Sequence, residues 1–535
     1  MMLILTNAGS IAVQSNDVAE KPFTGDPWRM KPSELIKNWL EICISDHDLC
    51  QISFTGEPLN KRKLTIVPRR LIQTFTRTKE GMVEKQIQLV QTSPEFSSSY
   101  VALSHCWGPP NKRPIRTTKS NLDQHLVGIA LQNLPQTFRD SVSLCVELGI
   151  QYLWIDSLCI VQDDEDEWKQ ESTVMGSIYE NALFTIAASS AVDSSQGLFG
   201  VKSKMDLVEI PYSNVGDVKE SVFAYIEPDL QKILSSAPLA ARAWVMQEYV
   251  LSRRIVHFTS HGMIWSCHND ENPGIRYMSS EFSNHWKSPF EYEWNLLVSN
   301  YSRRQLTYKS DKLVAINGLA NRFQQKHGKT YCCGLWIENL PHDLLWFSDE
   351  RLFWHTGSDI PSWSWASVTG PISFKSAVFD SPESVCGKVL PIQGSPGYLT
   401  IESSLKLVDC LHGPLQCQAF CFEDLRDMDF TGRMQDDYRN GHIKVSPTYL
   451  LLSGADKIGW GVFDEYNEPN CPVFCCPLLK QQVWEGFALS KEKQFLWTLL
   501  VCTVDGLNKF RRVGWGLILV PSWLDGIVMK DICLV

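Results

Sequence analysis

The sequence predicts an α/β core built on a mostly parallel sheet, followed by a helical segment and a β-rich C-terminal domain. Apolar runs that suit buried strands, at 101–104, 152–155 and 183–188, alternate with segments of helical periodicity. Beyond Pro361, short apolar runs separated by Gly and Pro predict strands instead. We expect four parts, which are an N-terminal extension with a helix and short strands (1–95), the α/β core (96–270), the helical segment (271–360) and the β-rich domain (361–535).

The N-terminal extension is expected to hold one helix and two short strands after a loose start at 1–30. Apolar residues between Leu35 and Cys43 recur at helical spacing after Pro32, which predicts a helix. The apolar runs at 64–67 and 87–90 predict strands joined by a charged loop.

Two helices are expected to link the strands of the core. Pro135 suits the first turn of one helix, and Gly149 suits its end. The acidic residues at 163–167 suit the positive end of the second helix, which continues to Ala182. The alternative for these carboxylates is a metal site. The rest of the chain is expected to form a Ser-rich irregular insertion (190–240), a helix (241–251), a hairpin (255–266), two helical pieces (294–323), and strands at 399–401, 405–408, 459–464, 497–504 and 513–519.

The composition argues against several functional classes. The 535 residues carry a net charge of −10, so binding to nucleic acid through a broad basic field is not expected. No segment reaches the roughly 18 uninterrupted apolar residues that a membrane helix needs, and the first residues lack a basic leader. The 17 cysteines follow no disulfide framework, so we expect reduced thiols in a cytoplasmic protein.

One cysteine and histidine cluster has the spacing of metal ligands. Cys43, His47 and Cys50 form a C-x3-H-x2-C pattern at the end of the first helix. A structural zinc site needs a fourth ligand, and the sequence offers none close by. We therefore interpret these residues as a packed helix end and predict no metal site.

Three blocks of the sequence, in this order, resemble the fungal heterokaryon-incompatibility (HET) domain. They are Tyr100-Val-Ala-Leu-Ser-His-Cys-Trp-Gly108, Leu153-Trp-Ile-Asp-Ser-Leu-Cys-Ile-Val-Gln162 with the helix that follows, and Arg242-Ala-Trp-Val-Met-Gln-Glu248. Segments 301–307, 311–318 and 361–366 are similar to the region that follows this domain in long family members. His105 and Ala243 depart from the pattern, since many members carry an aromatic residue and a glycine there. The resemblance implies a cytosolic effector or signalling protein in non-self recognition and regulated cell death.

The HET domain also resembles, remotely, the Toll-type (TIR) domain, and some TIR domains cleave NAD. This resemblance implies a TIR- or flavodoxin-like fold, NAD as a substrate with no bound cofactor, protein partners of the incompatibility system, and self-association. An alternative is a non-enzymatic adaptor that acts by self-assembly or partner binding. A third alternative is a member that has lost its activity and serves another role.

Glu171 is the predicted catalytic residue. It falls on a helical stripe with Trp168 and Met175, and a buried carboxylate is costly unless it is paired or functional. In a nicotinamide-cleaving site it would stabilise the oxocarbenium-like ribose or orient its hydroxyls, as carboxylates do in glycoside hydrolysis. The alternatives are a half-exposed position at the edge of the stripe, or a structural ion pair with Arg139 or Arg242.

The predicted ligand-binding residues are Ser104, His105, Trp107, Asp156 and Arg242. Because ligands of open α/β sheets bind beyond the carboxyl ends of the strands, the first four are expected to line one crevice with Glu171. Trp107 would stack on a base or nicotinamide ring, and Arg242 would bind phosphate. The alternatives are loop caps, core packing, and an ion pair for Arg242. Arg253 and Arg254 are weaker phosphate candidates with the same structural alternative.

Thiol catalysis is not expected. His105 and Cys106 are adjacent on a strand and so point to opposite faces, while Cys159 lies in an apolar run. The sequence also lacks the serine-hydrolase elbow and the glycine-rich phosphate loops.

Overall fold

The computed structural model describes residues 2–5, 31–58, 66–79, 82–200, 208–215, 218–226, 229–269, 290–348, 350, 352–355, 359–374, 383–390, 397–412, 448–465, 471–484, 492–504 and 509–535. The chain divides into two compact units, the first comprising Met1–Trp286 with Val314–Arg322 and the second Lys287–Leu313 with Phe323–Val535. Among the described residues, no helix has the length and apolar character needed to cross a membrane.

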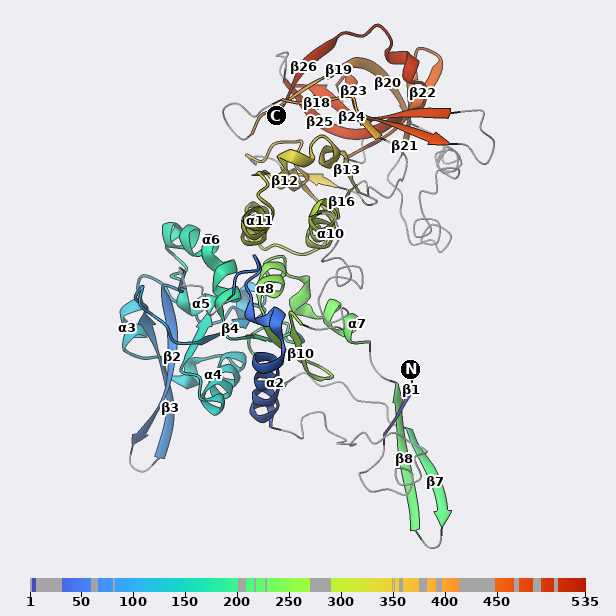
Figure 1. Cartoon of the computed structure of the whole chain (residues 1–535). Coiled ribbons are helices and arrows are strands. Elements are labelled where there is room, and N and C mark those ends of the chain that lie inside the picture. Colours follow the sequence, from blue (N-terminus) through green and yellow to red (C-terminus); the bar gives the residue numbers. More distant parts are fainter. Residues whose placement is uncertain are drawn as a thin grey trace. The chain divides into compact units, whose positions relative to one another are not determined.

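A seven-stranded sheet forms the centre of the first unit (Figure 1). Its order is β10 (Gly262–Cys267), β9 (Arg254–Thr259), β6 (Thr185–Ala187), β4 (Tyr100–Ser104), β5 (Tyr152–Ile155), β2 (Arg70–Lys79) and β3 (Met82–Gln91). The central strands β9, β6, β4 and β5 are parallel, and an antiparallel hairpin forms each edge. The predicted parallel core is confirmed at the centre of the sheet.

Seven α-helices lie wholly within the described part of this unit, and capping residues account for an end of two of them. They are α2 (Pro32–Asp46), α3 (Leu122–Val127), α4 (Gln136–Leu148), α5 (Asp156–Cys159), α6 (Glu165–Asn181), α7 (Leu230–Ser235) and α8 (Val245–Leu251). Gly149 ends α4 in the left-handed region, with φ 73°, which favours glycine. Asp164 caps α6, since its side chain accepts a hydrogen bond from the Glu167 N–H at 3.1 Å.

One hydrophobic core joins the N-terminal extension to the α/β core. Ile36, Leu71 and Ile87 belong to the same buried cluster as Leu103 and Ile155. Helices α6 and α8 pack closely because α6 carries a glycine at the contact. A Cβ atom on Gly176 would lie only 2.8 Å from Leu251 Cδ1.

Two predictions for the first unit were wrong. The strand expected at 64–67 is not formed at 66–67; the strand begins at Arg70, and 59–65 lie outside the described residues. The segment 190–240 is not wholly irregular, because β7 (Val208–Val215) and β8 (Val218–Ile226) form an antiparallel sheet with β1 (Met2–Leu5). Sequence patterns did not reveal this sheet because its third strand comes from the start of the chain. The rest of the expected loose start, residues 1 and 6–30, lies outside the described residues.

The second unit combines helix with many strands. It contains α10 (Phe290–Ser302) and the end of α11 (Val314–His327), as well as paired short strands. These strands are β11 (Tyr331–Cys332), β12 (Leu335–Trp336), β13 (Trp346–Phe347), β14 (Phe353–Trp354), β15 (Val368–Thr369) and β16 (Ser373–Phe374).

A ten-stranded sheet follows, which confirms the β-rich C-terminal region. Its strands are β17 (Glu383–Val385), β18 (Lys388–Val389), β19 (Leu399–Ser404), β20 (Lys406–His412), β21 (Thr448–Ser453), β22 (Asp456–Phe463), β23 (Val473–Trp484), β24 (Glu492–Thr503), β25 (Lys509–Ile518) and β26 (Met529–Leu534). Strands β23, β20, β21, β22, β25 and β24 pair in succession, and β24 returns to β23, so this part of the sheet closes into a ring.

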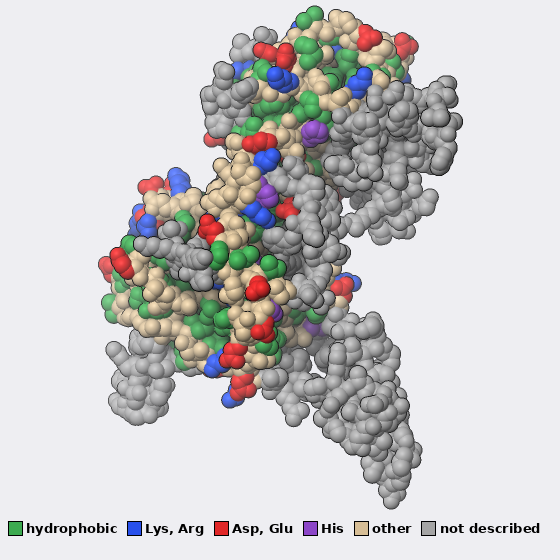
Figure 2. Space-filling model, viewed as in Figure 1, with side chains coloured by type: hydrophobic (Ala, Val, Ile, Leu, Met, Phe, Trp, Pro, Cys, Tyr) green, Lys and Arg blue, Asp and Glu red, His purple; other side chains and the backbone are tan. Residues whose placement is uncertain are grey.

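Charged side chains of both signs are interspersed on the face shown in Figure 2. Lys and Arg lie among Asp and Glu over the coloured residues of this face. The described surface in this view therefore carries no broad basic field, in keeping with the negative net charge.

Arg512 anchors the closed ring to the chain that precedes it within the second unit. Its guanidinium is fully buried and donates to both carboxylate oxygens of Asp464, each at 2.9 Å. It also donates to the carbonyl oxygens of Leu344 and Trp346 and lies 3.3 Å from the centre of the Trp346 ring. Each of the three guanidinium nitrogens therefore donates at least one hydrogen bond.

We expect Arg512→Leu to destabilise the second unit by about 3–5 kcal/mol, because it leaves the buried Asp464 carboxylate without its partner. The double variant Arg512→Leu with Asp464→Leu should recover part of the loss. Denaturant unfolding followed by circular dichroism measures both. Equal losses in the single and double variants would show that the ion pair is not the source of the effect.

Candidate functional site

A polar cluster lies at the carboxyl ends of the parallel strands. Ser104 is the last residue of β4, and its hydroxyl donates to a carboxylate oxygen of Glu248 on α8. The backbone carbonyl of the next residue, His105, accepts a hydrogen bond from Arg242. Asp156 directly follows β5 and begins α5. The sheet order places β4 beside β5, so these groups share one edge.

Asp156 is the carboxylate of this cluster that faces solvent. One of its oxygens accepts the indole N–H of Trp107 at 2.8 Å, and the other accepts the Ser157 N–H at 2.7 Å. Its side chain is nevertheless 21% exposed. The carboxylate is thus fixed in orientation by two donors and remains open to a ligand.

His105 lies behind Asp156 as a neutral ring. Its Nδ1 is 3.8 Å from the nearer Asp156 oxygen. Burial lowers the pKa of His105 to about 4, against the opposing effect of Asp156. The contact is therefore not an ion pair at neutral pH, and the ring packs edge-on against Phe138 at 5.0 Å between ring centres.

Glu248 lies beneath this surface and titrates near neutrality. Burial raises the pKa of Glu248 to about 7, although Arg242 and the hydrogen bond from Ser104 act in the opposite direction. Tyr179 of α6 also bonds to this carboxylate, and its hydroxyl lies 3.2 Å from the Leu103 carbonyl oxygen. A buried group with such a pKa can hold or release a proton at physiological pH.

The thiols near this edge are poor nucleophiles. Burial raises the pKa of Cys106 to about 11 and the pKa of Cys159 to about 12. Both thiols therefore stay protonated at neutral pH, which supports the interpretation that they are inert.

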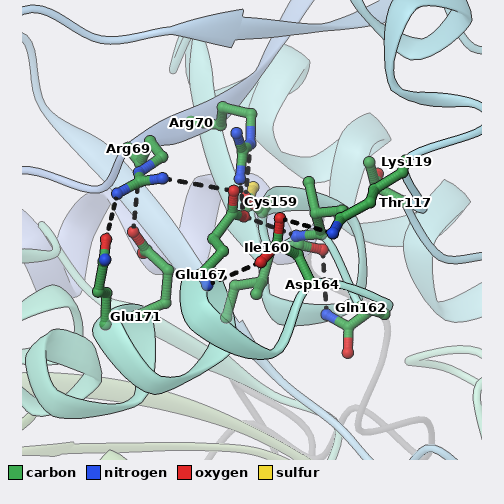
Figure 3. Close-up of polar contacts among 12 residues, drawn as sticks. Arg69, Arg70, Thr117, Lys119, Cys159, Ile160, Gln162, Asp164, Glu167 and Glu171 are labelled. Carbon is green, nitrogen blue, oxygen red and sulfur yellow. Dashed lines mark hydrogen bonds and ion pairs between the residues drawn. The ribbon is translucent and has the colours of Figure 1, made fainter.

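Glu171 belongs to a neighbouring network on α6, shown in Figure 3. Its carboxylate lies 3.5 Å from Arg69 Nε, and Glu167, one turn earlier, contacts both Arg69 and Arg70. Burial raises the pKa of Glu171, and Arg69 opposes that shift. The predicted burial of Glu171 is confirmed, and its ionic partner is Arg69, not Arg139 or Arg242.

The two networks share an edge of the sheet without a direct bond. Strand β2 is antiparallel to β5, with Ile72 opposite Leu153, so Arg70 lies near the end of β5. Arg70 also donates to the Cys159 carbonyl oxygen at 3.0 Å. In the described part of the chain, no hydrogen bond or ion pair joins Glu171 to the Asp156 cluster. The structure therefore brings together Ser104, His105, Trp107, Asp156 and Arg242, and leaves Glu171 beside them.

Residues 100–248 match the family model described as heterokaryon incompatibility protein (HET). The chain therefore contains a HET domain at residues 100–248. No curated protein and no solved structure matches it. The match indicates a role in heterokaryon incompatibility. The matched span of the HET domain begins at the start of β4 and ends at Glu248, so it includes the whole Asp156 cluster and excludes Arg69 and Arg70.

Glu248 is not among the site residues predicted from the sequence. The spacing of the apolar residues around Glu248 indicates that it is buried, because Glu248 lies three residues after Val245 and three before Leu251 on a short helix of the HET domain. The same pattern identified Glu171. Both acidic residues lie on buried stripes, and the sequence alone does not predict which side chain forms the hydrogen bond or ion pair with each of them.

We expect Glu248 to make the HET domain less stable as pH rises. Its folded pKa lies above the usual carboxyl value of 4.5, so the folded state holds a proton that the unfolded state loses between pH 4.5 and about 7. The corresponding loss of stability across that window is about 3 kcal/mol. Glu248→Gln should remove it, so the melting temperature of the variant should rise relative to the natural protein between pH 5 and pH 8.

The matched control is Glu165→Gln, because Glu165 is exposed at the start of α6. Its melting temperature should follow that of the natural protein at every pH. A constant difference between Glu248→Gln and the natural protein over this range would contradict the raised pKa.

Proposed function

We propose that this HET-domain protein acts by hydrolysing the bond between nicotinamide and ribose in NAD, at the edge of the sheet that carries Asp156. The observation that carries this proposal is the pairing of Trp107 with Asp156. An indole and a partly exposed carboxylate are held side by side at 2.8 Å, at the carboxyl end of parallel strands. Such an edge is where open α/β sheets bind ligands.

The chemistry requires an anion beside the ribose and does not require a general acid. The bond between the ribose carbon and the pyridinium nitrogen breaks, and its electron pair leaves with nicotinamide, which becomes neutral. A carboxylate stabilises the oxocarbenium-like ribose, as in glycoside hydrolysis. Water then adds to that carbon and releases one proton, giving ADP-ribose.

The other residues of the edge support this role. Trp107 offers a flat surface for the nicotinamide or adenine ring. Arg242, half-buried beside the His105 carbonyl, is the cation best suited to a phosphate of the dinucleotide. Glu171 remains the second carboxylate of the proposal, and its Arg69 partner is half-exposed, with 46% of that side chain accessible.

At the level of the cell, the proposal is an effector of the incompatibility response. Loss of cytoplasmic NAD would lead to regulated cell death, and assembly through protein partners or self-association would control it. Two observations favour the adaptor alternative. Glu171 is held by Arg69 and Glu248 is buried, and both arrangements also suit a purely structural function.

Nicotinamide release from NAD by the purified full chain tests the proposal directly. We expect release that increases with protein concentration, measured by liquid chromatography. Asp156→Asn should reduce the rate at least a hundredfold, the usual cost of losing one group that stabilises transition-state charge. Glu171→Gln should reduce it by a similar factor.

Glu165→Gln is the control for the acidic variants, since its side chain is exposed on the same helix as Glu171. It should retain full activity. Circular dichroism and melting temperature establish that each variant is folded. A folded natural protein that releases no nicotinamide at any concentration would contradict the enzyme and favour the adaptor. Loss of activity in Asp156→Asn alone would assign Glu171 a structural role.

A further inference from the structure

Four potential metal ligands converge in the first unit, away from the Asp156 edge. They are Cys43, His47, Cys50 and Cys267, and one donor atom from each lies within 4.8 Å of all the others. The Cys267 sulfur is 3.4 Å from His47 Nδ1. The three cysteines are buried and His47 is half-buried.

Three of these residues come from one N-terminal segment, and the fourth comes from a distant strand. Cys43 lies in the last turn of α2, His47 follows that helix, and Cys50 lies in the short 3-10 helix Asp48–Gln51. Cys267 is the last residue of β10, at the edge of the seven-stranded sheet. The sequence offers no fourth ligand near the first three residues and therefore does not predict a zinc site. The fold brings that ligand from a strand that follows the HET match.

We propose that Cys43, His47, Cys50 and Cys267 bind one structural zinc ion. Three thiolates and one imidazole form a set that zinc favours, and four protein ligands close the coordination sphere. Tetrahedral zinc with bonds of about 2.0–2.3 Å holds its donor atoms about 3.5–3.8 Å apart. The Cys267 sulfur and His47 Nδ1, 3.4 Å apart, are close to that spacing, and all four donor atoms lie within 4.8 Å of one another.

The surroundings of Arg254 support the proposal independently. This arginine is 2% exposed, and its Nε donates to the Cys43 sulfur at 3.1 Å. Its other nitrogens donate to the carbonyl oxygens of Cys50 and Leu183, each at 3.3 Å. Among the described residues, no carboxylate forms an ion pair with Arg254.

A buried guanidinium without a counter-charge is costly. A zinc ion with three thiolates carries one net negative charge, which would balance Arg254. The hydrogen bond from Arg254 would also orient the Cys43 thiolate, as outer partners of metal ligands commonly do. The site thus accounts for both the thiol cluster and the charge beside it.

The ion would join two segments that flank the HET match. Cys43, His47 and Cys50 precede residue 100, and Cys267 follows residue 248. Trp39 and Trp265 pack at the same contact, with 5.8 Å between ring centres. A metal that closes such a long loop stabilises the fold and holds α2 against the sheet edge.

Elemental analysis of the full chain, purified without chelators from zinc-supplemented cells, is the first test. We expect one zinc ion per chain, and a lower melting temperature after the ion is removed. Replacement by cobalt should give the thiolate charge-transfer band and the visible bands of a tetrahedral ion. No zinc or cobalt on the folded natural protein would overturn the proposal, as would a disulfide among the three cysteines in native thiol titration.

Two variants and a control identify the ligands. Cys267→Ser should lose the ion, and His47→Cys should keep zinc and change the cobalt spectrum, because a fourth thiolate replaces the imidazole. Cys145→Ala should keep the ion, since this buried cysteine lies on α4 outside the cluster. If Cys267→Ser does not fold, the cobalt spectrum of His47→Cys decides. Full zinc binding by folded Cys267→Ser, or a cobalt spectrum of His47→Cys identical to that of the natural protein, would overturn the assignment.

Discussion

The arrangement of the first unit depends on the buried carboxylates of one helix. Helix α6 places Glu167, Glu171 and Glu180 out of solvent, and removing the partner of a buried charge typically costs about 3–5 kcal/mol. Each carboxylate meets an arginine from outside the HET match, at Arg70, Arg69 and Arg322 respectively. Residues before and after the matched span are therefore part of the same electrostatic unit, and the matched residues alone would leave three buried charges without these partners.

The position of α6 also determines the candidate site. Tyr179 of this helix reaches the Leu103 carbonyl oxygen and the Glu248 carboxylate, so it joins α6 to the end of β4 and to α8. Trp168 packs edge-on against Trp244, with 6.2 Å between ring centres. The arginines that hold α6 thus act indirectly on Glu248, because any shift of the helix would change the surroundings that set its pKa near 7.

Local patterns predicted most of the first unit's elements, while pairings between distant segments were not predictable. The helix that ends at Gly149 and the strand Tyr152–Ile155 follow from caps and apolar runs, and the structure confirms both. The grouping of Ser104 and Asp156 was also predictable, since parallel strands align their carboxyl ends. The ionic partner of Glu171 was not predictable, because Arg69 lies about a hundred residues earlier. Ion pairs between distant segments leave no periodic pattern in the sequence, unlike pairs within one helix. The fourth cysteine of the proposed zinc site was missed for the same reason.

Two adjacent arginines show why residue type alone does not assign a phosphate site. Arg253 and Arg254 resemble an anion-binding pair in the sequence, but their donors are used by the protein itself. Arg253 donates to the carbonyl oxygens of Glu180 and Ala182, and burial lowers the pKa of Arg253 only to about 10, so it stays charged. Arg254 donates a hydrogen bond to the Cys43 sulfur on α2. The N-terminal segment also contacts α6 directly, because the Phe54 N–H donates to the Glu180 carboxylate at 3.0 Å. These arginines therefore hold the N-terminal segment and α6, so the phosphate contact that we propose falls to Arg242, which is half-buried.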